Sequence, residues 1–116
     1  MGPLRVNIIN TMQLIASVTD QLEYQNTANV NVANELVNQW FCDFYHPTDS
    51  QFLNEFSESE QKVLFEFNCF FDCRVSALPD TLNEMLISPI WQEVVLRSKA
   101  VLDELKWQGL DVRYEC

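Results

Sequence analysis

Glycine is nearly absent from this chain, and its scarcity constrains the fold more than any other feature of the sequence. Only Gly2 and Gly109 occur among the 116 residues. All-β folds and phosphate-binding loops need glycine where the backbone adopts unusual angles, so the scarcity favours helices. Because 47% of the residues are hydrophobic, the chain also has ample material for a buried core. We therefore expect an all-α fold in which residues 1–116 form a single compact bundle of five or six helices.

Apolar residues repeat at helical spacing along the first half of the chain. The spacing predicts one long amphipathic helix from Leu4 to Leu22, followed by a polar connection at residues 25–29. A second helix is expected from Ala33 to Phe44, and Pro47 ends it because the residue before a proline avoids helical angles. About two further helical turns are expected within residues 50–56.

Two capping motifs predict where later helices begin. Ser57-Glu58-Ser59-Glu60 has the spacing of a capping box, in which each terminal side chain bonds the backbone amide of the other residue. We expect the helix that follows to be the central hydrophobic helix of the bundle, over Val63 to Leu78, and to stop at Pro79. Thr81-Leu82-Asn83-Glu84 is a second capping box and predicts a short helix through about Ile87.

Ser88-Pro89 predicts the start of the last helix, since proline fits the first helical position without losing an amide bond. On this helix we expect Glu93 and Arg97 to form a surface pair. Lys106 is expected to interact with the helix C-terminus, and Gly109 to adopt the left-handed cap. Residues 110–116 alternate weakly, and we leave open whether they form a strand, a docked extension or a loose tail.

Charge is segregated between the two halves of the chain. No Lys or Arg occurs from Val6 to Gln61, although eight carboxylates lie in this segment, and it contributes most of the formal net charge of -10. Such a field repels nucleic acid and anionic lipid and speeds encounter with a basic molecule. We therefore expect a basic protein partner, and neither nucleic-acid nor membrane binding.

The sequence also predicts the compartment. The N-terminal residues lack a basic region followed by a continuous apolar run, so no secretion signal is predicted. No window offers the ~20 apolar residues that a transmembrane helix requires. We expect a cytoplasmic protein in which Cys42, Cys69, Cys73 and Cys116 stay reduced.

Aromatic and acidic side chains gather between Trp40 and Glu60. Large aromatic residues anchor interfaces, and carboxylates around them pair with Arg and Lys of a partner. Helical spacing assigns Trp40, Phe41 and Phe44 to the core, and a purely structural role for the acids, as capping or solvated residues, is the alternative. The residues that we expect to bind a partner are Asp43, Tyr45, Asp49, Glu55, Glu58 and Glu60.

A zinc site is an alternative that the cysteines raise. Cys42 and His46 lie four residues apart on one predicted helix, and Cys69 and Cys73 lie four apart on another. Three thiolates and one imidazole suit tetrahedral zinc, but the tight Cys-x2-Cys knuckles of structural zinc sites are absent. We therefore expect no metal and no cofactor, and keep this quartet as the alternative.

Catalysis is not indicated by any motif. His46 is the only histidine, and Asp43 and Asp49 are close enough in sequence to orient it as a general base. No nucleophile elbow, phosphate loop or paired metal motif accompanies it. We expect a protein that is not an enzyme and has no catalytic residues.

In small size, acidity, helical character and lack of a catalytic motif, the chain resembles the cytosolic immunity proteins of bacterial contact-dependent growth inhibition and related polymorphic toxin systems. The resemblance concerns the general character of the chain and carries over no individual residue. It implies a cognate toxin as partner, such as a nuclease domain, whose basic active-site cleft the chain would occlude. We expect such a toxin inhibitor to be a monomer or a weak homodimer.

Two other functions stay open from the sequence. A nucleic-acid mimic or regulatory protein would bind several unrelated basic proteins, because carboxylates spaced like phosphates do not select one of them. A zinc-dependent or thiol-dependent accessory protein would require stoichiometric metal for folding.

Overall fold

The chain folds almost entirely into helices, and the computed structural model describes residues 2–110. Within this range the elements are α1 (Pro3–Ala16), α2 (Val18–Thr27), α3 (Val32–Asn38), the π-helix η1 (Gln39–Phe44), α4 (Ser50–Leu53), α5 (Glu58–Val75), α6 (Leu82–Leu86) and α7 (Pro89–Leu105). The all-α expectation is confirmed. The described residues form seven α-helices and one π-helix, whereas we predicted five or six helices.

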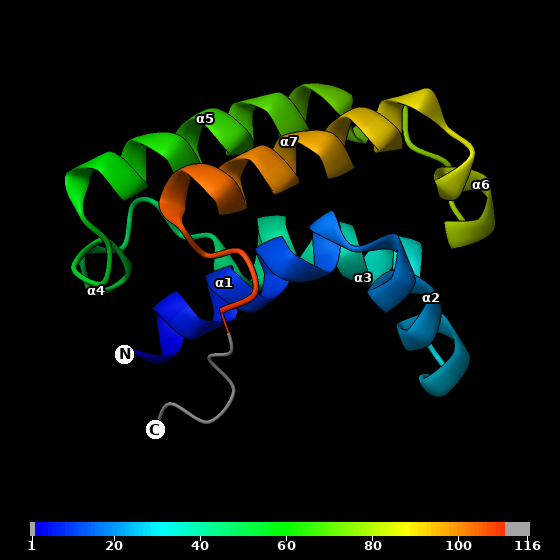
Figure 1. Ribbon diagram of the computed structural model, residues 1–116, viewed down its shortest axis with the longest axis horizontal. Coiled ribbons are helices and arrows are strands. Elements are labelled where there is room, and N and C mark those ends of the chain that lie inside the picture. Colours follow the sequence, from blue (N-terminus) through cyan, green and yellow to red (C-terminus); the bar gives the residue numbers. More distant parts are fainter. Residues whose placement is uncertain (1, 111–116) are drawn as a thin grey trace.

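The helices are arranged in two layers. α5 and α7 lie side by side along one face, and α1 runs beneath them together with α2 and α3 (Figure 1). α6 lies at one end, where it contacts α2, α3 and α7, and α4 lies at the opposite end (Figure 1). The segment without Lys or Arg, residues 6–61, supplies most of α1 and all of α2 to α4, whereas α5 and α7 carry Lys62, Arg74, Arg97 and Lys99.

α1 lies at the centre of the fold. It contacts α2, α3, η1 and α7. The side chains of Ile8, Ile9, Met12 and Ile15 are fully buried. Burial of large aliphatic side chains is the main favourable term in folding, so this helix holds the two layers together.

The expectation that Val63 to Leu78 forms the central helix is wrong. α5 buries Leu64, Phe67 and Phe71 along one narrow face, whereas Phe65 is 56% exposed. The sequence suggested burial on most sides because apolar residues occur all around this helix. The fold encloses only one side of it.

The long helix predicted from Leu4 to Leu22 is broken at Ser17. The Ser17 hydroxyl accepts the Asp20 amide at 3.1 Å, which starts α2 as a new helix. The buried Gln21 side chain donates to two carbonyl oxygens at the end of α1, at 3.0 and 2.9 Å. Helical periodicity could not reveal this break, because a buried side chain of the next helix stabilises it. α2 then continues to Thr27, so the predicted connection at residues 25–29 begins later than expected.

The predicted helix from Ala33 to Phe44 is present, but its second half is π-helical. After it, the Tyr45 amide donates to the Trp40 carbonyl at 3.1 Å, the five-residue spacing of a π-turn. The predicted turn at Pro47 is followed by α4, which is one turn long where about two were expected.

Local capping signals are largely confirmed. The Ser57 hydroxyl and the Glu60 carboxylate form the reciprocal capping box of α5. At the second motif the Thr81 hydroxyl accepts the Glu84 amide at 3.3 Å, but it also donates to the Glu84 carboxylate at 2.9 Å, so only half of that box forms. Pro89 is the first residue of α7, as predicted.

The predicted pair between Glu93 and Arg97 is wrong. Glu93 accepts a hydrogen bond from Arg74 at 2.8 Å, and Arg97 lies 4.0 Å from Glu66. Both arginines also lie over the ring of Phe70, at 3.5 and 5.2 Å from its centroid. The side-by-side packing of α5 and α7 supplies these partners, and helical spacing within α7 could not indicate them.

The end of α7 also differs from the prediction. Lys106 itself adopts the left-handed conformation with φ of 60° and caps the helix, while Gly109, with φ of 70°, lies beyond this turn. The Trp107 amide donates to the Leu102 carbonyl at 2.8 Å, and the Trp107 ring is buried. Because this ring is buried, the left-handed turn that ends α7 falls at Lys106 and not at Gly109. Of the predicted tail 110–116, all but the first residue lies outside the described range.

Candidate functional site

Arg5 is the only cation before Lys62, and it is engaged in an internal ion pair. Its guanidinium donates two hydrogen bonds to the Glu60 carboxylate, each 2.7 Å long. The side chains are 22% and 16% exposed, and the guanidinium lies over the rings of Phe56 and Trp107. The hydrogen bond from Arg5 lowers the pKa of Glu60, and the same bond raises the pKa of Arg5. Glu60, predicted to bind a partner, thus has a structural role.

Glu55 fixes the N-terminus of α1. Its carboxylate accepts the backbone amide of Arg5 at 2.9 Å, and its backbone carbonyl accepts the Arg5 guanidinium at 3.1 Å. Gly2, the N-cap of α1, makes no side-chain cap, and a Cβ placed there would collide with the Glu55 carboxylate. Glu55 therefore satisfies a free amide at the positive end of α1 from a distant part of the chain. This second predicted contact residue is also structural.

Tyr45 belongs to the core and not to an exposed contact surface. Its side chain is 6% exposed and stacks on Trp40 with ring centroids 4.8 Å apart. Phe52 meets the same ring edge-on at 5.7 Å. Burial raises the pKa of Tyr45 to about 12, with a smaller contribution from Cys69. Tyr45, predicted to bind a partner, is therefore not an exposed contact residue, and its part in binding stays a prediction.

Three of the predicted contact residues, Asp43, Asp49 and Glu58, lie on the surface. Asp43 is near the end of η1, and Glu58 is the first residue of α5. The Asp49 carboxylate accepts the Gln51 amide at 2.9 Å and so caps α4 as well. These three carboxylates follow one another along the chain around the η1–α4 connection, and they are the part of the predicted site that is free to meet a partner.

An apolar groove of about 230 Å³ opens beside this connection. Its floor is formed by three buried side chains, those of Tyr45 directly after η1, Phe52 of α4 and Leu64 of α5. Phe65 forms an exposed wall. We call it the Phe65 groove, and its lining residues are Tyr45, Pro47, Phe52, Leu53, Gln61, Leu64 and Phe65. Asp49 lies between Pro47 and α4, and Glu58 lies one turn before Gln61 on α5, so acidic residues flank the groove.

Polar bonds hold the walls of the Phe65 groove in place. Gln61 Nε2 on α5 donates to the carbonyls of Leu53 and Phe56, at 3.0 and 3.1 Å. Trp40 Nε1 on η1 donates to Asn68 Oδ1 on α5 at 3.1 Å. π-helical turns such as η1 are rare and occur frequently at functional sites. The groove is therefore formed by fixed elements in the folded chain.

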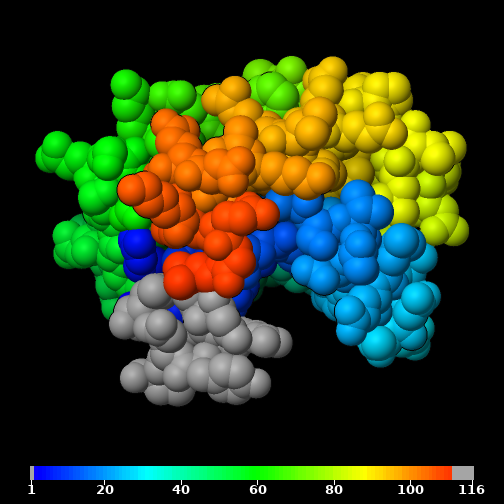
Figure 2. All heavy atoms as spheres, viewed as in Figure 1, coloured from blue at the N-terminus to red at the C-terminus, as the bar shows by residue number. Residues whose placement is uncertain are grey.

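A second, larger cleft of about 620 Å³ lies between α7 and the α1–α2 junction. Figure 2 shows this face, on which α7 and the residues after it lie beside α1 and α2. Its lining mixes apolar side chains, such as Leu102, with polar ones, which include Gln13, Asp20, Lys99 and Gln108. Because Asp20 and Lys99 have opposite charges, this cleft does not select a ligand of one sign.

The alternative zinc quartet is not assembled. Within residues 2–110, no group of three or more His, Cys, Asp or Glu side chains lies close enough to hold a metal ion. Cys42, Cys69 and Cys73 are free and exposed. The His46 ring nitrogen lies 2.9 Å from the Asp43 backbone oxygen and is held in the turn by this contact.

The same contact bears on the acid–base interpretation of His46. The ring contacts the backbone oxygen of Asp43 and not its carboxylate. Asp49 directs its carboxylate to the Gln51 amide. The geometry that orients a histidine as a general base, a carboxylate on the second ring nitrogen, is not formed by the two residues that the sequence suggested.

Comparisons with known proteins give no relative for this arrangement. No protein-family model matches the chain, and neither the curated proteins nor the solved structures include a significant match. Within the described part of the chain, no helix has the length and apolar character needed to cross a bilayer.

Sequence reasoning missed the Phe65 groove because it expected the helix over Val63 to Leu78, which includes Phe65, to be central in the bundle. One signal could have found it. Glu58, Phe65 and Asp72 follow each other at intervals of seven residues, so they lie in one row along α5. An acid on each side of an aromatic residue in the same row indicates a solvent-facing row.

Proposed function

We propose that this chain is an inhibitory binding protein that recognises a basic surface of another protein. The observation that carries the proposal is the ion pair between Arg5 and Glu60, which engages the only cation among the first 61 residues. Among the ion pairs of residues 2–110, none involves the exposed carboxylates Asp43 and Asp49 of the same segment. Folding does not require such segregation, because a surface of mixed charge also keeps a protein soluble.

The proposed inhibition follows from the basic surfaces that attract an acidic protein, because many of them are substrate-binding clefts of enzymes. Enzymes that bind phosphate groups, including nucleases, hold them with Arg and Lys. An acidic protein seated in such a cleft excludes the substrate sterically and electrostatically, and long-range attraction speeds its association. In its most specific form, the proposal is an immunity-type protein that neutralises the nuclease domain of a toxin.

The proposed contact surface is the η1–α4 connection and the start of α5. It contains the exposed acids Asp43, Asp49 and Glu58, and the Phe65 groove lies among them. Glu55 and Glu60 are excluded from it because their carboxylates hold α1 and Arg5.

The test begins with partners captured from the source cells and eluted with rising salt. Association with the captured protein is then measured for the wild type and for Asp43→Asn/Asp49→Asn/Glu58→Gln, which removes three charges while Asp49→Asn retains a capping oxygen. The matched control, Asp80→Asn/Asp103→Asn/Glu104→Gln, removes three charges from positions elsewhere on the chain. We expect the first variant to slow association about tenfold at low salt and to flatten its salt dependence, and the control to change it by less than about threefold.

Two results would contradict the proposal. Equal slowing by both triple variants would mean that only the total charge matters and that no specific surface is involved. Capture of many unrelated basic proteins would favour a nucleic-acid mimic. Inhibition of a nuclease activity of the captured protein, at one-to-one stoichiometry, is the result expected for the immunity-type function.

A further inference from the structure

The Phe65 groove combines a preformed apolar cavity with an exposed aromatic wall. A cavity of about 150 Å³ is large enough to hold benzene, so the 230 Å³ of this groove accommodates one large apolar side chain. Phe65 is 56% exposed beside it. Exposed apolar groups next to a cavity are typical of interface cores, where a few anchoring side chains provide most of the binding energy.

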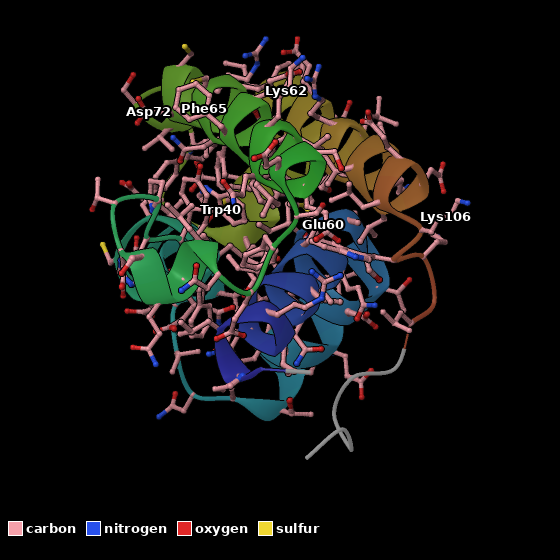
Figure 3. The ribbon with its side chains drawn as sticks, turned by 90° about the vertical axis from the view of Figure 1, so that its left-hand side faces the viewer. Trp40, Glu60, Lys62, Phe65, Asp72 and Lys106 are labelled. Atoms are coloured by element: carbon pink, nitrogen blue, oxygen red, sulfur yellow. The ribbon has the colours of Figure 1, made fainter. Side chains whose placement is uncertain are left out.

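Carboxylates surround this apolar centre on α5. Glu58 and Asp72 lie seven residues before and after Phe65, so each is about 10 Å from it along the helix axis, in the same row. Figure 3 shows Phe65 and Asp72 together on the side of α5 that faces away from α7. Asp49 adds a third carboxylate from the opposite wall, at the start of α4. Lys62 is a nearby cation on α5, and it lies on the outer surface of the helix (Figure 3).

We infer that the Phe65 groove receives one large apolar side chain from a basic segment of the partner protein. Lys or Arg residues on either side of that anchor meet Glu58 and Asp72 along α5, and Asp49 across the groove. This inference rests on the proposed function and specifies the chemistry of the partner at the same surface. The anchor follows from the cavity and from Phe65, and the sign of its neighbours follows from the three carboxylates.

The row on α5 also fixes the spacing of the basic residues. In an extended peptide each residue spans about 3.3 Å, so positions three before and three after the anchor lie about 10 Å from it. This distance matches the separation of Glu58 and Asp72 from Phe65. The probe is therefore the synthetic peptide Arg-Ser-Ser-Phe-Ser-Ser-Arg. Its controls replace the central Phe by Ala, or both Arg by Glu.

The first experiment titrates each peptide into the isotope-labelled chain and follows the amide resonances by NMR. We expect the Phe peptide to shift resonances of Leu53, Leu64 and Phe65, and each control peptide to bind at least fivefold more weakly. Equal binding of the Ala peptide would overturn the apolar anchor, and equal binding of the Glu peptide would overturn the basic flanks. Shifts at the groove that depend on the concentration of the chain alone would identify a second copy as the occupant and overturn the inference.

The second experiment separates this inference from the proposed function. Phe65→Ser removes the exposed wall, and Leu96→Ser makes the same kind of change at a 65% exposed position on α7. We expect Phe65→Ser to weaken binding of the captured partner at least tenfold and Leu96→Ser to change it less than twofold. Partner binding that depends on Asp43, Asp49 and Glu58 but not on Phe65 would overturn the groove and leave the proposed function standing. Peptide binding at the groove, without capture of any basic partner, would support the groove and count against the proposed function.

Discussion

Replacing Arg5 by Met tests whether the ion pair with Glu60 is as important to the fold as its geometry indicates. Met keeps an unbranched apolar side chain over Phe56 and Trp107 but removes the guanidinium. The change eliminates the two 2.7 Å hydrogen bonds to Glu60 and the 3.1 Å bond to the Glu55 carbonyl. It also leaves Glu60, whose side chain is 16% exposed, without its counterion.

The expected magnitude follows from these contacts. A hydrogen bond to a charged group contributes about 1.5 to 3 kcal/mol, and loss of one partner of a fully buried ion pair costs about 3 to 5 kcal/mol. Because about a fifth of each side chain reaches water, we expect a loss of about 2 to 3 kcal/mol in the free energy of unfolding. Arg97→Met is the matched control, since Arg97 is 41% exposed and lies 4.0 Å from Glu66. It should cost less than about 1 kcal/mol.

The pH dependence gives an independent measurement of the same pair. Arg5 lowers the pKa of Glu60 in the folded state, so the unfolded chain binds the proton more readily. The stabilisation is therefore fully present above the unfolded value near 4.5 and is lost as the pH falls through the folded pKa. The difference in stability between wild type and Arg5→Met should shrink over that acidic range.

Urea unfolding followed by circular dichroism provides the free energies, with an unchanged m-value as the check on two-state behaviour. A double-mutant cycle with Glu60→Gln isolates the pair, because Gln retains the capping contact with Ser57. We expect a coupling energy of about 1 to 2 kcal/mol. Additive effects of the two substitutions, or a loss below about 0.5 kcal/mol for Arg5→Met, would refute the reasoning.

Three further predictions concern the core. Phe67→Ala should cost about 3 to 5 kcal/mol, because the ring is fully buried against Trp40; a loss below about 1 kcal/mol in urea unfolding would place the ring at the surface. Gln21→Ala should cost about 2 to 3 kcal/mol, since it removes the hydrogen bonds that Gln21 makes with Trp91 Nε1 and with the Leu14 and Ile15 carbonyls, of which the Leu14 carbonyl also accepts the Ser17 amide. A thermal scan that finds no larger shift than for Gln25→Ala would count against that role. Between pH 10 and about 12 the folded Tyr45 keeps a proton that the unfolded chain loses, so stability falls as the pH rises. Tyr45→Phe should reduce this alkaline loss, and an identical pH profile would contradict the burial of the hydroxyl.

Local signals in the sequence predicted the local parts of the fold. The capping box at Ser57, the proline start at Pro89 and the turn at Pro47 depend on residues within a few positions of each other. The breaks and pairs that were missed depend on distant residues. The Gln21 side chain donates hydrogen bonds to carbonyls at the end of α1. Arg74 of α5 donates to Glu93 of α7, which the sequence had paired with Arg97.

The candidate site shows the same division. Its sign came from counting residues, because the segment from Val6 to Gln61 has eight carboxylates and no Lys or Arg. The sequence could not show which of these carboxylates are free to bind a partner. Glu55 and Glu60 are used by the N-terminus of α1, which lies fifty or more positions away in the chain.

The sequence by itself determined that the chain is helical, where several helices begin, and that its first half carries unopposed negative charge, since these properties reside in composition and short-range spacing. Only the tertiary structure decided that α1 and not α5 is central, that Tyr45 is buried, and that Phe65 is exposed beside a groove. The physical reason is that the side of a helix that is buried depends on which elements pack against it. On α5, aromatic residues occur on opposite sides, so periodicity could not choose the buried one, and the packing of η1, α4 and α7 made that choice.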